Sequence, residues 1–303
     1  MELERKQPYS GLSYFLIAVG IVMVNIFIFN QFSQWLCLRL YDVDIMPLMQ
    51  SRLFETLRQN EINALKFSQA FTSFGGFIMS SLVIIQVFRE KPIAFMKLDK
   101  APKLMHWLLG FVLFFALMPV VQQLLAWNEW FKPTDSTSAF MQMVESIDKQ
   151  NNRMYELLLL NNTGWSTMLN LLVMALLPAI GEEFFFRGIL YRVFSDWTKK
   201  QHLAVWLTAI LFTVMHFQFF KLLPMLLLAA SFGYLMYFSG SLWLSIVLHF
   251  VNNAIVVVSD SMIKNGYQYD FLREDFMFPV LATVICSAIA AYTFYHFYKT
   301  RVV

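Results

Sequence analysis

Long stretches of this chain are apolar and contain no Asp, Glu, Lys or Arg. A helix of about 20 apolar residues crosses the hydrocarbon core of a bilayer, so each stretch of that length predicts a membrane span. Barrel strands would alternate apolar and polar residues, whereas these stretches are apolar on all faces. The stretches are 7–38, 67–88, 104–128, 157–181, 201–220, 222–259 and 276–298.

One stretch, 222–259, is about twice as long as a single span requires. It contains a turn-like break at Ser239-Gly240-Ser241, and we therefore interpret it as two helices. The expected number of spans becomes about eight. The fold class predicted from this pattern is all-α, a polytopic membrane helix bundle.

Composition excludes the other broad classes. Hydrophobic residues make up 58% of the chain and charged residues 14%, with a mean hydropathy of +0.55, whereas soluble proteins carry about 25% charged residues. The 32 Phe residues argue against disorder, and two Cys cannot form a disulfide scaffold. The net charge of +3 is spread over short loops, so we expect no nucleic acid partner.

Lys and Arg are distributed unevenly between the segments that join the spans. They are denser in the short segments that lie inside if the N-terminus is inside, and sparser in the long segments 37–66 and 129–156. The positive-inside rule then predicts that both termini are inside. We expect an integral, multi-pass protein of a bacterial inner (cytoplasmic) membrane, with the lipid bilayer around it.

The chain divides into three expected parts. Residues 1–164 form N-terminal spans with outside loops, 165–260 form a core that carries the polar motifs, and 261–303 form an outside loop, the last span and a cytoplasmic tail. Within the first part, 136–160 has apolar residues at helical spacing among polar ones. This segment is either an interfacial helix on the outer leaflet or a solvated helix packed on the loops.

Charged side chains inside spans are costly and indicate function. The first group is Gly181-Glu182-Glu183, followed by three Phe and Arg187. Glu183 and Arg187 are four residues apart on a helix and can form a pair, which leaves Glu182 free for other chemistry. The alternative is that both Glu residues only cap the inner end of a span.

Two further groups follow on later spans. His216 lies four residues after Phe212, and His249 and Asn253 share one helix face, with Ser245 one turn earlier. Taken singly, each group is as well explained by helix packing, because polar side chains also join membrane helices.

Taken together, these side chains satisfy one another only if their helices converge. Convergence requires the fourth span to extend to about Arg192, or the fifth to be tilted, and we expect the site in the cytoplasmic half of the bilayer. A cluster of this kind can activate water, bind a metal through Glu182, His216 and His249, or carry protons in a transporter.

The three groups resemble the motifs of the CAAX protease and bacteriocin-processing (CPBP or Abi) family of intramembrane proteases. The family pattern E-E-x-x-x-R is matched by Glu182, Glu183 and Arg187. F-x-x-x-H is matched by Phe212 and His216, and H-x-x-x-N by His249 and Asn253. The resemblance covers about residues 165–260.

This resemblance implies a CAAX prenyl endopeptidase-like enzyme of the glutamate type that cleaves a membrane-associated peptide or protein. It implies that Glu182 and His216 activate water, that His249 and Asn253 form the oxyanion hole, and that Glu183 and Arg187 support the site. No cofactor is implied. Zinc at Glu182, His216 and His249 stays an alternative, as does a non-catalytic binding or immunity protein.

Overall fold

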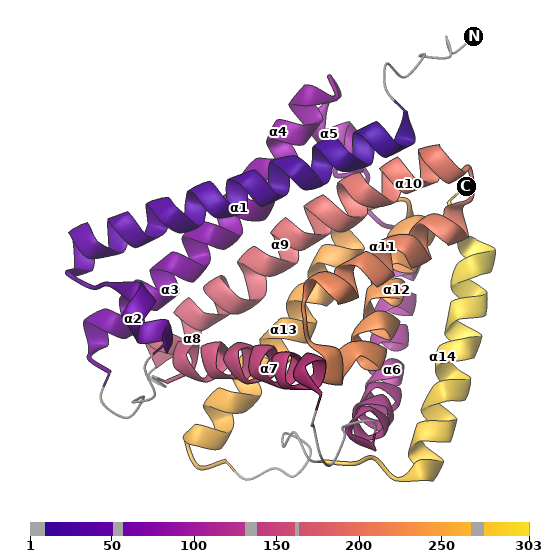
Figure 1. Ribbon diagram of the computed structural model, residues 1–303. Coiled ribbons are helices and arrows are strands. Elements are labelled where there is room, and N and C mark those ends of the chain that lie inside the picture. Colours follow the sequence, from indigo (N-terminus) through magenta and orange to yellow (C-terminus); the bar gives the residue numbers. More distant parts are fainter. Residues whose placement is uncertain (1–9, 51–56, 131–137, 161–163, 268–275, 303) are drawn as a thin grey trace.

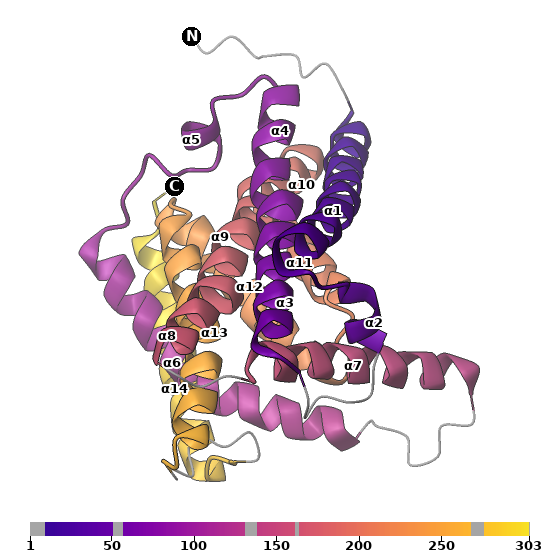
Figure 2. The same ribbon diagram turned by 90° about the vertical axis from the view of Figure 1, so that its left-hand side faces the viewer.

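The regular structure of the chain is helical in every part that the computed structural model describes. The described residues are 10–50, 57–130, 138–160, 164–267 and 276–302, and they contain no β-strand. Most of the helices pack side by side, while α7 (Ala139–Leu158) runs across one end of the bundle (Figures 1 and 2). The expected all-α class is confirmed.

Seven helices among the described residues are long and apolar enough to cross a membrane. The chain is therefore a multi-pass membrane protein. In chain order the helices are α1 (Gly11–Tyr41), the continuous run of α3, η1 and α4 (Gln59–Val87), α6 (Leu104–Trp130), the run from α8 to α10 (Gly164–Thr198), η4 with α12 (Phe219–Ser239), α13 (Trp243–Lys264) and α14 (Val280–Thr300). Two short helices, α2 (Ile45–Gln50) and α5 (Pro92–Phe95), lie between them.

The stretch 201–220, which was expected to be the fifth of eight spans, forms the shorter helix α11 (Gln201–Met215). Its length of about 22 Å is less than the hydrocarbon core of about 30 Å. The helix ends because His216 caps it and Phe217 adopts a positive φ of 51°, which turns the chain toward α12 (Leu222–Ser239).

The direction of the chain nevertheless alternates as eight spans would require. The α11–α12 pair forms a hairpin, and the start of α1 and the end of α14 lie at the same end of the bundle (Figure 1). Which side of the membrane this end faces stays a prediction.

The helix from Gly164 to Thr198 positions the first polar motif. It consists of α8 (Gly164–Asn170), η2 (Leu171–Leu176), α9 (Leu177–Glu183), η3 (Phe184–Leu190) and α10 (Tyr191–Thr198), where η2 and η3 are π-helical. The helix passes through the charged residues and beyond Arg192, which meets the condition for convergence. Wider π-helical turns are rare and recur at functional sites.

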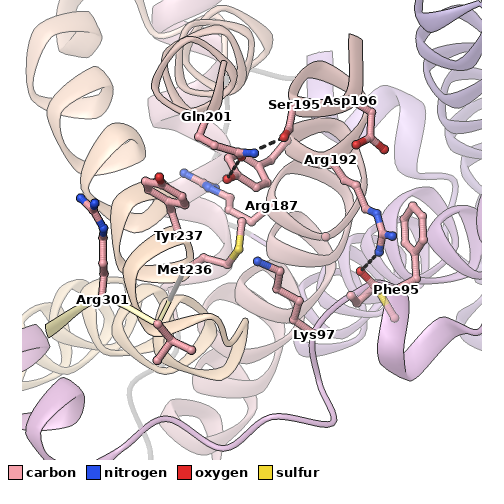
Figure 3. Close-up of a pocket in the computed structure, with 14 residues that line it drawn as sticks. Phe95, Lys97, Arg187, Arg192, Ser195, Asp196, Gln201, Met236, Tyr237 and Arg301 are labelled. Carbon is pink, nitrogen blue, oxygen red and sulfur yellow. Dashed lines mark hydrogen bonds between the residues drawn. The ribbon is translucent and has the colours of Figure 1, made fainter. Parts of the chain in front are cut away.

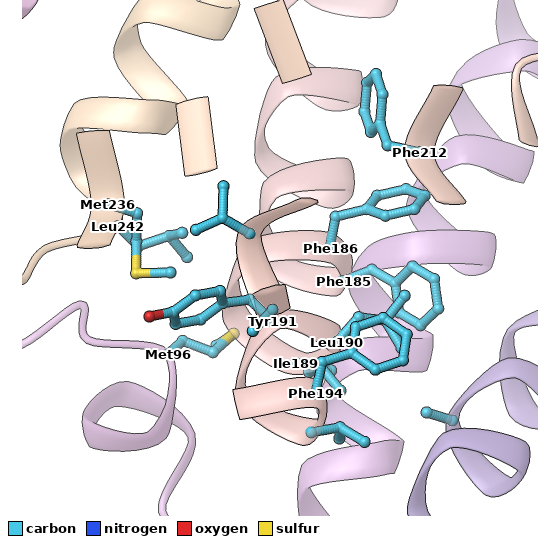
Figure 4. Packing of buried hydrophobic residues seen from close by; sticks show 14 of the residues in the cluster. Met96, Phe185, Phe186, Ile189, Leu190, Tyr191, Phe194, Phe212, Met236 and Leu242 are labelled. Carbon is cyan, nitrogen blue, oxygen red and sulfur yellow. The ribbon is translucent and has the colours of Figure 1, made fainter. Parts of the chain in front are cut away.

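The helix continues past these charges because the residues that follow them are apolar and buried. Phe185, Phe186, Ile189 and Leu190 are at most 1% exposed and pack with residues of α1, α11 and α12 (Figure 4). The rings of Phe186 and Phe212 meet edge to face at 4.9 Å. This cluster joins α11 to the helix that carries the motif.

Glycines allow two of these helices to approach η1 (Phe74–Met79) closely. A Cβ on Gly181 would lie 2.9 Å from Cβ of Phe77, and Gly75 faces the ring of Phe29 on α1. Small residues of this kind let backbones approach in membranes, where packing drives association. Gly181 directly precedes Glu182, so this contact fixes the position of the carboxylate along the bundle.

Asparagine side chains hold the tip of the α11–α12 hairpin. Asn151 Nδ2 of α7 donates to the carbonyl of Phe217 at 3.5 Å, and Asn128 Nδ2 of α6 donates to that of Phe220 at 3.1 Å. The helix expected within 136–160 is present as α7, although residues 136 and 137 lie outside the described residues. Its location at a membrane interface stays a prediction.

Candidate active site

Glu183 and Arg187 form the buried centre of the site. Nη1 of Arg187 donates to Oε1 of Glu183 at 2.8 Å, and the two side chains are 1% and 0% exposed. Nη2 of Arg187 donates to the carbonyl of Ala229 on α12, and the guanidinium lies 4.7 Å from the ring centre of Phe212. The expected pair is therefore present, and it ties the motif helix to both α11 and α12.

His249 binds the same oxygen of Glu183. Its Nδ1 lies 2.9 Å from Oε1 of Glu183, which also accepts from Arg187. An ionised carboxylate can only accept hydrogen bonds, so Nδ1 of His249 carries the proton. In the neutral imidazole, Nε2 then has a free lone pair.

Glu182 lies between the two histidines. Its Oε2 is 3.7 Å from Nε2 of His216 and 3.7 Å from Nε2 of His249. These distances lie beyond the range of a hydrogen bond, so the Glu182 carboxylate is not hydrogen-bonded to either histidine. The Glu182 side chain is 14% exposed and that of His216 is 28% exposed, whereas Glu183 is fully buried.

A backbone carbonyl fixes the orientation of His216. Nδ1 of His216 lies 2.7 Å from the carbonyl oxygen of Phe212, one turn earlier on α11. Because a carbonyl only accepts, this nitrogen also carries a proton, and Nε2 faces Glu182. Both imidazoles therefore present the same nitrogen to one carboxylate oxygen.

Helix α13 supplies the remaining polar residues that the sequence singled out. Ser245 Oγ donates to the carbonyl of Phe232 at 2.8 Å, and this bond joins α13 to α12. Asn253 lies one turn beyond His249, and its Oδ1 accepts from Nδ2 of Asn252 at 3.2 Å. The structure thus brings Glu182, His216 and His249 within 4 Å of one another through Glu182, and it places Asn253 one turn beyond His249 on α13.

Three aromatic residues of the site were not expected to contact it. Phe212 supplies the ring beside Arg187, and the Phe232 ring stacks on the imidazole of His249 with centroids 5.3 Å apart. On α7, desolvation and the negative charge of Glu182 raise the pKa of Tyr155. The sequence offered a signal only for Phe212, which begins the F-x-x-x-H motif.

The donor types at the site suit zinc. Glu182, His216 and His249 are residue types that bind zinc, and metal-bound histidines also direct their second nitrogen to an acceptor. Within the described ranges, however, no group of three or more His, Cys, Asp or Glu side chains is placed to hold a metal ion.

Comparisons with known proteins agree with the motifs. A family model described as Type II CAAX prenyl endopeptidase Rce1-like matches residues 164–255, which is less than half of the chain. All six candidate residues lie in this range, and the family implies a peptidase. No curated protein and no solved structure matches the chain. Residues 164–255 therefore resemble the Rce1-like type II CAAX prenyl endopeptidase family, as the three motifs predict.

Proposed function

We propose that this protein is an intramembrane endopeptidase of the glutamate type, which hydrolyses a peptide bond in a membrane-associated peptide or protein. One observation carries the proposal. Nε2 of His216 and Nε2 of His249 both lie 3.7 Å from one oxygen of Glu182, and both imidazoles are oriented by a hydrogen bond from Nδ1. A carboxylate held between two oriented imidazoles is suited to take a proton from water.

In the first step, water attacks the carbonyl carbon of the scissile peptide bond. Glu182 takes one proton from this water, and Nε2 of His216 accepts a hydrogen bond from the other. The electron pair of the carbonyl moves to its oxygen, which becomes an oxyanion. In the second step the protonated Glu182 gives its proton to the leaving amine as the C–N bond breaks, and Glu182 is regenerated.

The oxyanion needs hydrogen-bond donors of its own, apart from the Glu182 and His216 side chains that hold the attacking water. His249 supplies one from Nε2 when its imidazole is doubly protonated. Asn253, one turn along α13, supplies a second donor from Nδ2. Removing one donor of this kind typically costs about 2.7–4 kcal/mol of transition-state stabilisation.

Glu183 and Arg187 act as positioning residues in this scheme. Glu183 orients His249 through Nδ1, and Arg187 holds Glu183 through its own bond to the same oxygen. Neither has to touch the substrate. Prenylated CAAX proteins are the substrates that the family's name suggests, and for this chain we extend the proposal only to membrane-associated peptides and proteins.

The substitution Glu182→Gln tests the proposal. It keeps the size of the side chain but removes the base, so cleavage should fall by about 10²–10⁴-fold. Protein termini are compared in membranes from cells that carry wild type or variant at equal abundance, and Asp99→Asn, an exposed carboxylate in a loop, is the matched control. Termini specific to wild type and Asp99→Asn support the proposal, whereas termini that are identical with Glu182→Gln would favour the binding-protein alternative.

The zinc alternative is favoured by the orientation of the two imidazoles and has its own measurement. Because no metal-holding group of three or more His, Cys, Asp or Glu side chains is found among the described residues, we expect purified protein to contain less than stoichiometric zinc, unchanged in His216→Ala and His249→Ala. Elemental analysis of the three proteins checks this expectation. Stoichiometric zinc that is lost in both variants would establish the metal-dependent version.

A further inference from the structure

A cavity lies apart from Glu182, His216 and His249, at the end of the bundle where α1 begins and α14 ends (Figure 3). Its volume is about 340 Å³, within the usual range of small-molecule sites. The walls come from α5 and the loop after it, the α10 region, the end of α12 and the residues after α14. The hydrogen bond from the Val302 amide to the carbonyl of Phe238 keeps the chain end in place at 2.9 Å.

The charges around this cavity are unbalanced. Lys97, Arg192 and Arg301 line it, and Asp196 is the one carboxylate among the described residues that do so. Within the described part of the chain, none of these three cations has a carboxylate within salt-bridge distance. Burial lowers the pKa of Lys97, and the nearby positive charges of Lys100 and Arg192 lower it further.

Two of the cations are held in place by the surrounding chain. The guanidinium of Arg192 lies 4.3 Å from the ring centre of Phe95 and donates to the carbonyl of Phe95 at 3.2 Å (Figure 3). The guanidinium of Arg301 lies 4.0 Å from the ring centre of Tyr298. Pre-positioned guanidinium groups bind phosphate oxygens in pairs of hydrogen bonds, at little further entropic cost.

The rest of the lining is apolar or aromatic. Met96, Met236 and Val302 line the cavity beside the cations, and Tyr237 adds an aromatic face. The cavity lies where α12 and α14 end, and the ends of membrane-spanning helices are expected at the depth of lipid headgroups. A molecule with a phosphate and an adjoining apolar chain matches both the cationic and the apolar side chains that line the cavity.

The cavity is separate from the catalytic residues. Glu182, His216 and His249 do not line it, and the guanidinium of Arg187, which does, is engaged with Glu183 and the carbonyl of Ala229. Of the six candidate site residues, only Arg187 therefore lines this cavity. Its occupant need not be the peptide that is cleaved.

We infer that this cavity binds the phosphate group of an anionic phospholipid, with Lys97, Arg192 and Arg301 as its ligands. Basic pockets between membrane helices at the headgroup level are suited to such lipids. The site is independent of the proposed peptidase chemistry, so it can be tested in a protein that is not cleaving a substrate.

The test uses the full chain, purified in neutral detergent, and follows its thermal unfolding while phosphatidylglycerol is added. Phosphatidylcholine and inorganic phosphate at equal concentrations are the comparison probes. We expect a rise in the unfolding temperature with phosphatidylglycerol alone, and an apparent affinity about tenfold lower in Arg192→Gln. Arg301→Gln, a change at the end of the chain, should give a similar loss and serves if Arg192→Gln does not fold.

Lys103→Gln is the matched control, because this exposed lysine lies in the loop between α5 and α6 and does not line the cavity. It should retain the affinity of wild type. An equal loss in Lys103→Gln, or an equal effect of phosphatidylcholine, would overturn the inference. Inorganic phosphate that stabilises as strongly as the lipid would identify a soluble phosphate as the ligand and overturn the lipid assignment.

Discussion

Oxygen Oε1 of Glu183 receives hydrogen bonds from both Arg187 and His249 in a place that solvent does not reach. Burial of a charge costs several kcal/mol unless a partner compensates it, and here the opposite charges of Glu183 and Arg187 compensate each other. The same bonds set the proton positions on His249. The stability of the buried ion pair and the orientation of the His249 imidazole therefore both depend on Oε1 of Glu183.

We expect Glu183→Gln to lower the free energy of unfolding by about 3–5 kcal/mol, because it leaves Arg187 charged and buried without its anion. The double variant Glu183→Gln/Arg187→Met removes both charges and should recover part of this loss. Thermal unfolding of the two variants in detergent measures the difference. A double variant that is less stable than Glu183→Gln alone would contradict this explanation.

The exposed pair Glu145 and Lys149 on α7 is the matched control, since these residues are also four apart on a helix. Their nitrogen and oxygen atoms lie 3.9 Å apart, and Lys149 is 79% exposed. Exposed pairs of this kind contribute about 0.3–0.5 kcal/mol. Glu145→Gln should therefore leave the unfolding temperature nearly unchanged.

At the level of helices, the contact between Gly181 and η1 sets how closely the motif helix approaches its neighbour. A Cβ at this position would meet Phe77 at 2.9 Å and Ile78 at 3.3 Å. Gly181→Ala should therefore destabilise the protein by about 1–3 kcal/mol and, by moving Glu182, reduce cleavage. Gly20→Ala on α1, where nothing lies within 4 Å, should leave both unchanged or slightly raise stability.

Thermal unfolding and the termini assay measure the two effects separately. Equal stability and cleavage in Gly181→Ala and wild type would show that the bundle adjusts to the added methyl group. The close approach would then not matter for the position of Glu182.

Helix positions were largely predictable from stretches without charges, but helix ends were not. The expected span 67–88 began directly after Lys66, yet this lysine lies inside α3 (Gln59–Ser73) and is only 2% exposed. Its Nζ lies 2.8 Å from Oγ of Ser166. Glu182 and Arg187 likewise did not end the fourth span. Ser166, the partner of Lys66, and the carbonyl of Ala229, a second partner of Arg187, lie on other helices, so a local pattern cannot reveal them.

The opposite error occurred at α11. Residues 216–220 carry no acid, Lys or Arg, so the hydrophobic pattern continued through them, whereas the backbone turns at Phe217. The need of polar side chains on apolar helices for partners was sufficient to predict that Glu182, His216 and His249 come together. It could not predict the partners of the two Nδ1 atoms, because one is a backbone carbonyl and the other depends on side-chain rotation.

For the whole molecule, the distribution of Lys and Arg makes a prediction about orientation. With Cys37 and Cys286 replaced by Ser, a cysteine at Lys200 should react with a membrane-impermeant reagent only from the cytoplasmic side. A cysteine at Asn265 should react only from the opposite side. Labelling of intact cells and of inverted vesicles measures both, and the reverse pattern would contradict an inside N-terminus.

The shortness of α11 also has a consequence for the lipid around the protein. A helix about 8 Å shorter than the hydrocarbon core creates hydrophobic mismatch, which a bilayer relieves by thinning locally. The hairpin tip, with carbonyls that bind Asn128 and Asn151, would otherwise place polar backbone against acyl chains. Membranes with shorter acyl chains should therefore accommodate this protein with less deformation, so bilayer thickness becomes a determinant of where it resides.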